Sequence, residues 1–461
     1  MTEQRTVEIE NKAGVVRDWT KGSILGNLLS ISWPMILSGT LNMLGPTVDL
    51  IWVGKLGDDA VAGVGIAGMV VILAQSLVMG LFIGLQAIIA RSIGAGDTKY
   101  AVHAARQGLI IGAAISILMA VIGSYYAEDI LNIVGASPAV VQLGGQYLRI
   151  QLIGAMTLSF QWMTNSTMVA SGDTMRPLWI SAAYRTFHIA LCPFLVFGWW
   201  IFPRMGVSGA ALTNVLAQGV GAAIGFWFLF SGRTRLRLSL TGLRLDFRTM
   251  WQMIKIGIPA SVTTMDRTLI GFVLMALVTS FGTLSVAAHT IGQRIDTFIL
   301  VPVISYGSAA GVLAAQNLGA NQPQRAKRST WMAVGFYSMV IVLIVAALWF
   351  WAEYVTGIFS NEPDLVALSS LYIRIQLAGY LIFSLVMVLS QCLSIVGDTI
   401  VVMVTGLVTN WGISLPLAIF LPKITNLGVK GIWWAIVAGL AVRAVIFTTY
   451  FLTGRWVKRR I

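Results

Sequence analysis

Charged side chains are scarce in this 461-residue sequence, in which Lys and Arg occupy 31 positions, Asp and Glu occupy 18, and the four together make up 11%. An ordinary soluble domain carries roughly 25%. Apolar residues fill 57% of the chain, which at about 20 residues for each membrane crossing is enough for about twelve spans. The composition therefore excludes most soluble folds and predicts a polytopic membrane protein.

Residues that carry enzymatic chemistry are also few. Cys192 and Cys392 lie in apolar runs, and the three histidines are far apart in the sequence, so neither a disulfide framework nor a zinc motif is indicated. A phosphate-binding GxxxxGK[ST] loop is absent, and the pair Asp58-Asp59 falls in a short turn rather than in the paired helical clusters of a prenyltransferase. We expect no enzymatic activity, no cofactor and no resident metal.

Apolar runs define the predicted transmembrane helices, and the fold class they predict is an all-α polytopic membrane protein. The first residues are mixed in charge and do not resemble a secretory signal. Twelve spans are expected near residues 28–53, 60–90, 105–127, 139–170, 178–202, 207–231, 251–280, 285–315, 329–352, 365–396, 399–421 and 429–453.

The distribution of basic residues predicts the topology. Twenty-one Lys and Arg flank the spans on the side of both termini, and four lie on the other side, at Lys55, Arg204, Lys423 and Lys430. Short cytoplasmic loops retain basic residues, so we expect both termini in the cytoplasm and the spans in the cell membrane. The net charge of +13 then reflects topology and a weak attraction to anionic lipids, not nucleic-acid binding.

An internal repeat divides the chain into two halves. YLRIQLIG at 147–154 recurs as YIRIQLAG at 372–379, and GDT at 172–174 recurs at 397–399, both at an offset of 225. Near the end the offset becomes 222, where Gly206-Val207 matches Gly428-Val429. Each copy holds six spans, so the copies share one orientation and form two six-helix lobes, related by a pseudo-twofold axis along the membrane normal.

The repeat sets the domain boundaries and indicates a mechanism. We expect a cytoplasmic tail at 1–23, an N-lobe at 24–232, a basic interfacial linker at 233–250, a C-lobe at 251–454 and a basic tail at 455–461. Two facing lobes favour alternating access, the mechanism of secondary transporters.

Ionisable residues inside spans are the candidates for ion coupling because they are costly to bury. Asp49 lies near the outer end of the first span in a neutral segment, and its repeat counterpart is Leu274, so symmetry of the fold does not require an acid there. Such a carboxyl could exchange a proton. A hydrogen-bonded residue at a helix end is the structural alternative.

A second group of ionisable residues is predicted in the C-lobe. Adjacent antiparallel spans bring its members to similar depth, and equal numbers of Asp and Arg indicate a structural ion-pair network. A role in coupling or substrate binding is the alternative. The group comprises Asp266, Arg267, His289, Arg294 and Asp296.

Several motifs together resemble the multidrug and toxic compound extrusion (MATE) family over about residues 24–455. They are P-x14-D-x4-G-x2-G from Pro34 through Asp49 to Gly57, RSIGAGD at 91–97, AQNLGA at 315–320 and the paired GDT. IGQRIDTF at 291–298 is similar to the branch named for a DNA-damage-inducible protein. The resemblance implies export of amphipathic or cationic drugs driven by inward proton or sodium flow.

The resemblance also implies a cation site in the N-lobe. Asp49 matches the family's acid in span 1. Counted from Pro193, His188 and Cys192 occupy the positions at which the family usually has Asn and Asp, and Thr213 and Asn214 fall near its span 6 position. Replacing oxygen ligands by imidazole and thiol disfavours sodium, and a titratable histidine favours protons.

The sequence thus predicts a proton-coupled multidrug exporter, with sodium coupling as the alternative ion. A flippase for a lipid-linked precursor could use the same architecture, and a scaffold would not explain the buried charges. A major facilitator should carry a DRxGR-type loop after span 2, where this chain has RSIGAGDTKYA. The expected partners are small organic cations or amphipathic drugs and membrane lipids, with the protein acting as a monomer and binding no nucleic acid.

Overall fold

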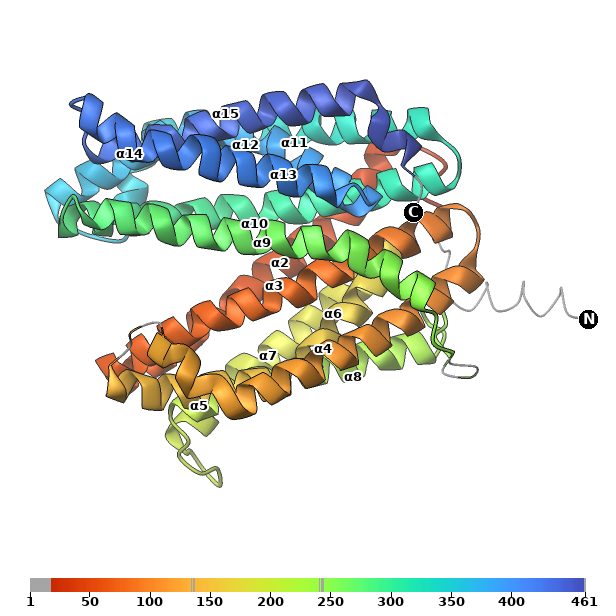
Figure 1. Ribbon diagram of the computed structural model, residues 1–461, viewed down its shortest axis with the longest axis horizontal. Coiled ribbons are helices and arrows are strands. Elements are labelled where there is room, and N and C mark those ends of the chain that lie inside the picture. Colours follow the sequence, from red (N-terminus) through yellow and green to blue (C-terminus); the bar gives the residue numbers. More distant parts are fainter. Residues whose placement is uncertain (1–17, 134, 136, 240, 242–243, 460–461) are drawn as a thin grey trace, which may run out of the picture. The chain divides into compact units, whose positions relative to one another are not determined.

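The computed structural model describes residues 18–459 apart from 134, 136, 240, 242 and 243. The regular elements of this part of the chain are all helices (Figure 1). The first half contains α2 (Ile24–Val53), α3 (Asp58–Gly94), α4 (Thr98–Ile133), α5 (Pro138–Ile153), α6 (Ala155–Ala170), α7 (Met175–Phe197) and α8 (Val207–Phe230). The second half contains α9 (Phe247–Thr279), α10 (Thr283–Gly319), α11 (Pro323–Gly357), α12 (Pro363–Val396), α13 (Thr399–Thr409), α14 (Leu415–Ile424) and α15 (Val429–Thr453).

The predicted all-helical, twelve-span architecture is confirmed. By length and apolar composition, 11 helices of the described chain can cross a membrane, with the segment from α13 to α14 counted as one. The predicted fourth span is divided at Gly154 into α5 and α6, each of 16 residues. A side chain at Gly154 would meet Val215 of α8 within 2.3 Å, so this break lies where α8 makes a close approach. The corresponding helix of the second half, α12, continues through Gly379.

The internal repeat is visible in the helix boundaries. Helices α3 and α10 begin at Asp58 and Thr283 and end at Gly94 and Gly319, so both pairs of ends keep the offset of the repeated motifs. Two salt bridges also repeat at this offset. Arg149 contacts Glu128 at 3.0 Å, and Arg374 contacts Glu353 at 3.1 Å. The four side chains are exposed, so these salt bridges contribute little to stability. They show that the two halves of the chain have equivalent contacts.

The chain forms two compact units, which are the two lobes. Of the described residues, unit 1 holds 33–261 with the segment 18–21, and unit 2 holds 22–32 and 262–459. The division between the units falls inside α2 and α9, and the predicted boundaries of the tails, lobes and linker stay predictions. In unit 1, α3 packs on α4, α5 and α6, and α8 contacts α5, α6 and α7. In unit 2, the long helix α12 packs on α10, α11 and α15.

Polar side chains join α2 to α7 in unit 1. The hydroxyls of Ser38 and Ser181 lie 2.7 Å apart, and Tyr184 donates to the amide oxygen of Asn42. Pro46 of α2 and Pro193 of α7 lie inside their helices, and each lacks the backbone N–H that would donate a helical hydrogen bond. The two helices therefore meet along a polar seam that ends close to Asp49.

A π-helical turn shapes the corresponding region of unit 2. Residues Asn410–Ser414 form this turn between α13 and α14. Gly439 allows α15 to lie close to the π turn, because a Cβ at position 439 would be 1.8 Å from the hydroxyl of Ser414. A π turn adds one residue to the helix and rotates the side chains that follow. Asn410 and Trp411 are the first two residues of this turn, and both side chains contact Asp266 of α9.

Candidate functional sites

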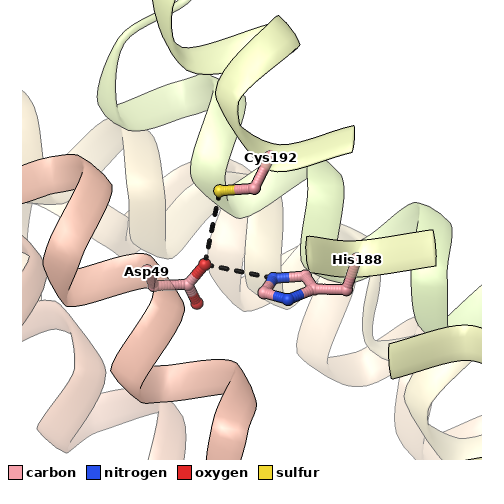
Figure 2. A group of neighbouring side chains, drawn as sticks. All are labelled: Asp49, His188 and Cys192. Atoms are coloured by element: carbon pink, nitrogen blue, oxygen red, sulfur yellow. Dashed lines mark hydrogen bonds and ion pairs between the residues drawn. The ribbon is translucent and has the colours of Figure 1, made fainter. Parts of the chain in front are cut away.

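Asp49 is the centre of a buried polar site within unit 1. Asp49 is 5% exposed, and its carboxyl group faces two side chains that lie one helical turn apart on α7 (Figure 2). His188 Nε2 lies 3.1 Å from Asp49 Oδ1, and the Cys192 thiol donates to the same oxygen at 3.8 Å. The spacing of four residues places His188 and Cys192 on one face of α7. The structure thus brings together three residues predicted from the sequence.

The second carboxylate oxygen of Asp49 is held by α8. Asn214 Nδ2 donates to Asp49 Oδ2 at 2.6 Å and to the carbonyl of Ala210 at 3.3 Å. This amide fixes the carboxylate so that Oδ1 faces α7. Thr213 is buried, but its hydroxyl donates to the carbonyl of Gly209 at 2.7 Å. Of the five predicted residues, Thr213 therefore takes a backbone partner in place of Asp49.

The chemistry of this site suits a small cation or a proton. One ligand atom from each of Asp49, His188 and Cys192 lies within 4.8 Å of the others, a spacing at which one cation could contact all three. His188 is fully buried, and neither ring nitrogen makes a well-oriented hydrogen bond among the described residues. No Lys or Arg in this part of the chain forms an ion pair with Asp49. A buried acid with only uncharged or titratable neighbours is typical of ion pathways in membrane proteins.

The predicted C-lobe residues do not form an ion-pair network in the described chain. Asp266 accepts hydrogen bonds from Asn410 Nδ2 and Trp411 Nε1, each at 2.6 Å. Arg443 of α15 donates to Asn410 Oδ1 at 2.6 Å and to the hydroxyl of Thr409 at 2.8 Å. Asn410 and Trp411, which open the π turn, are thus the neutral donors to Asp266. Among the described residues, the hydrogen bonds that connect Asp266 to an arginine thus run through the amide of Asn410.

Asp296 has a different environment, built from phenols. Its carboxylate accepts hydrogen bonds from Tyr372 at 2.6 Å and from Tyr380, both on α12. His289 packs edge-on against Tyr372 with the ring centroids 5.4 Å apart. Arg294 is exposed, because it stands two residues from Asp296 and so points to the opposite side of α10. The structure therefore separates Arg294 from the predicted cluster.

A cavity of about 250 Å³ lies within unit 2 and collects most of these side chains. Its walls come from α9, α10, α12, α15 and the π turn. The charged lining residues are Arg267, Arg443 and Asp296, and the polar ones include His289, Gln293, Gln376 and Asn410.

Sequence reasoning missed the partners of the C-lobe acids. Tyr372 lies in the repeated motif YIRIQLAG, and the predicted repeat could have indicated it as a structural position. The motif does not indicate that the hydroxyl of Tyr372 contacts Asp296. Asn410 and Trp411 depend on the π turn, for which the sequence gives no signal.

The sequence profile of the MatE family matches the chain twice, at residues 34–194 and 259–420. The second match begins at the equivalent position of the second repeat, because Pro34 and Pro259 are repeat counterparts. Together the matches cover more than half of the chain. The chain belongs to the MatE family of transporters. The predicted family resemblance is thereby confirmed, and the protein is a membrane transporter and not an enzyme.

Similar proteins agree with this assignment along nearly the whole MatE chain. It is 24% identical to the probable multidrug resistance protein YoeA of Bacillus subtilis over 460 residues, which cover 99% of both chains. It is 26% identical to an FAD transporter of Shewanella oneidensis over 412 residues, 89% of this chain and 90% of that protein. An outward-facing MATE family transporter superposes with a TM-score of 0.89 at 22% identity, covering 96% and 98% of the two chains.

Proposed function

We propose that the protein exports amphipathic and cationic organic compounds in exchange for protons, and that Asp49 carries the coupling proton. In this cycle Asp49 takes a proton from the outer side and the N-lobe rearranges. The drug is displaced outward before the lobes return. The protonated and empty states prefer different packing of α2 and α7, which couples ion binding to substrate release.

The observation that carries this proposal is the contact of Asp49 Oδ1 with both His188 and Cys192. An imidazole and a thiol supply nitrogen and sulfur, whereas sodium binds through hard oxygen ligands. Asn214 donates a hydrogen bond to the other carboxylate oxygen of Asp49. A proton needs no further ligands, so the residues present support proton coupling over sodium. The excess of Lys and Arg on the side of both termini supports a cytoplasmic location for the termini in a cell-membrane protein.

Efflux of a fluorescent cation from proteoliposomes tests the proposal when proton and sodium gradients are imposed separately. We expect the wild type to respond to the proton gradient and Asp49→Asn to lose that response while remaining folded. Asp129→Asn is a matched control, because Asp129 is an exposed acid of the same lobe. Full proton-driven efflux by Asp49→Asn would refute the role of Asp49. A response of the wild type to sodium alone would refute the interpretation of His188 and Cys192.

A further inference from the structure

Arg267 of α9 is a cationic side chain with no carboxylate within salt-bridge distance in the described chain, although the charge of the adjacent Asp266 acts on it. It lines the unit 2 cavity, and it forms no ion pair there. Its hydrogen-bond contact is the sulfur of Met387, 3.5 Å from Nη2, and a thioether is a weak acceptor. Asp266, the preceding residue in sequence, accepts hydrogen bonds from Asn410 and Trp411. Arg267 is exposed, so its guanidinium is accessible to a ligand in this cavity, and ionisable residues of membrane helices that line a cavity mark substrate or ion pathways.

The other charged residues of the cavity have their own uncharged partners. Arg443 donates to the side chains of Thr409 and Asn410. Asp296 accepts from two tyrosine hydroxyls. The lining residues therefore carry two positive charges and one negative charge, and the guanidinium of Arg267 is the group whose donors are left for a ligand.

His289 provides a second and independent sign of a missing ligand. The side chain is 1% exposed and lines the same cavity. Neither of its ring nitrogens has a hydrogen-bond partner among the described residues. Leaving a buried polar group unpaired costs free energy, so His289 together with Arg267 indicates that the cavity is completed by a group rich in acceptor oxygens.

We propose that the unit 2 cavity is a subsite for the anionic group, above all a carboxylate, of an amphipathic substrate, and that Arg267 binds that group. The inference rests on the proposed export function and adds a class of substrate to it. Arginine suits this role because its planar fork donates two parallel hydrogen bonds to a carboxylate. Tyr372, Tyr380 and Phe383 offer aromatic walls beside it.

The size of the cavity fits one end of such a molecule. Pockets for whole drug-sized ligands measure about 300–1,000 Å³, and this cavity measures about 250 Å³. It therefore takes the carboxylate and an attached ring. The preferred substrates are molecules that join an acidic group to an aromatic system, including zwitterions.

A matched pair of dyes tests the subsite on the full chain in lipid nanodiscs. One is a rhodamine with a free carboxylate, and the other is the methyl ester of the same dye, so the two differ in the anionic group. Fluorescence polarisation gives the Kd of each. A hydrogen-bonded charged pair is expected to make the wild type bind the acid about 10- to 100-fold more tightly than the ester. Arg267→Gln should remove this preference and leave the affinity for the ester unchanged.

Two further variants keep the test decisive. Arg294→Gln removes an exposed arginine of the same lobe and should retain the preference for the acid. Arg267→Lys keeps the positive charge but loses the two parallel donors of the guanidinium, so its preference for the acid should be smaller than that of the wild type. This variant tests the role of Arg267 if Arg267→Gln does not fold. Equal binding of the two dyes by the wild type, or a preference that survives Arg267→Gln, would overturn the proposal.

The occupant and the dependence on export are tested separately. If anionic phosphatidylglycerol in the nanodiscs abolishes the preference that is seen in phosphatidylcholine, a lipid phosphate occupies the site and the substrate proposal is overturned. Asp49→Asn should keep the preference for the acid while losing proton-driven efflux. A preference without any efflux in the wild type would count against the proposed export function alone. Efflux without the preference would count against the subsite alone.

Discussion

Cys192→Asp should convert the N-lobe site into one that responds to sodium. The thiol lies 3.8 Å from Asp49 Oδ1, so a carboxylate in its place would face Asp49 at a similar distance. It would also restore the acid that the family resemblance implies at this position. His188 and Asn214 would remain as the neighbouring polar groups.

The distance sets the size of the effect. Two negative charges about 4 Å apart repel by about 4 kcal/mol at an effective dielectric constant of about 20. A bound cation removes this repulsion, and a ligand at about 100 times its Kd stabilises the folded state by about 2.7 kcal/mol. The repulsion between Asp49 and the new carboxylate is therefore large enough to drive measurable sodium binding.

Thermal unfolding of the purified protein at pH 8 provides the assay, with sodium compared against choline at equal ionic strength. We expect sodium to raise the Tm of Cys192→Asp and to leave the wild type unchanged. Cys192→Asn introduces a side chain of the same shape as aspartate but without its charge, so sodium should not change the Tm of this variant. If Cys192→Asp unfolds at the same temperature in both salts, the geometry inferred for this site is refuted.

Two further predictions concern other parts of unit 1. Hydrogen bonds from Thr249 and His103 hold the pKa of Asp246 well below its usual range. Ionised Asp246 therefore stabilises the fold above about pH 4. At pH 7 the Tm of Asp246→Asn should lie below that of the wild type, and this difference should shrink as the pH falls below about 4. A difference in Tm that stays constant down to pH 3 would contradict the prediction. A Cβ at Gly63 would lie 3.0 Å from the backbone of α5, whereas one at Gly65 meets nothing within 4 Å. Gly63→Val should thus lower the free energy of unfolding by about 1–3 kcal/mol, and Gly65→Val should leave it unchanged. Thermal unfolding followed by circular dichroism measures both.

The fold could be predicted because membrane helices are constrained by length. Each span must cover the hydrocarbon layer with apolar residues, so the hydropathy pattern and the internal repeat were sufficient to place the spans. The division of the fourth span at Gly154 was not predicted. It depends on which helices approach closely, and hydropathy carries no information about that.

The two candidate sites differ in how far the sequence could define them. His188 and Cys192 were placed beside Asp49 through their spacing from Pro193, and the structure gives contacts at 3.1 and 3.8 Å. In the C-lobe, similar depth was taken to indicate ion pairing, but depth does not fix the rotation of a helix. Helical periodicity alone could have separated Arg294 from Asp296, since residues two apart face opposite sides.

The repeat relates the two sites to each other. Applying its offsets, Leu274 and Ile436 correspond to Asp49 and Asn214, and both apolar residues line the unit 2 cavity. The acid and amide that form the N-lobe site are thus replaced by apolar side chains at the equivalent place in the C-lobe. Arg267 in turn corresponds to Asn42 of α2, which accepts a hydrogen bond from Tyr184.

Substitution at these few equivalent positions can give the two lobes different ligands without altering the fold. An acid that exchanges a proton needs close polar neighbours and little space, as around Asp49. A subsite for part of an organic molecule needs apolar walls, an unpaired charge and a cavity, as around Arg267. Under the two proposals, the N-lobe carries the coupling ion and the C-lobe recognises the anionic end of the substrate. Asp49→Asn and Arg267→Gln should therefore impair efflux in distinct ways, the first for every substrate and the second mainly for those that bear a carboxylate.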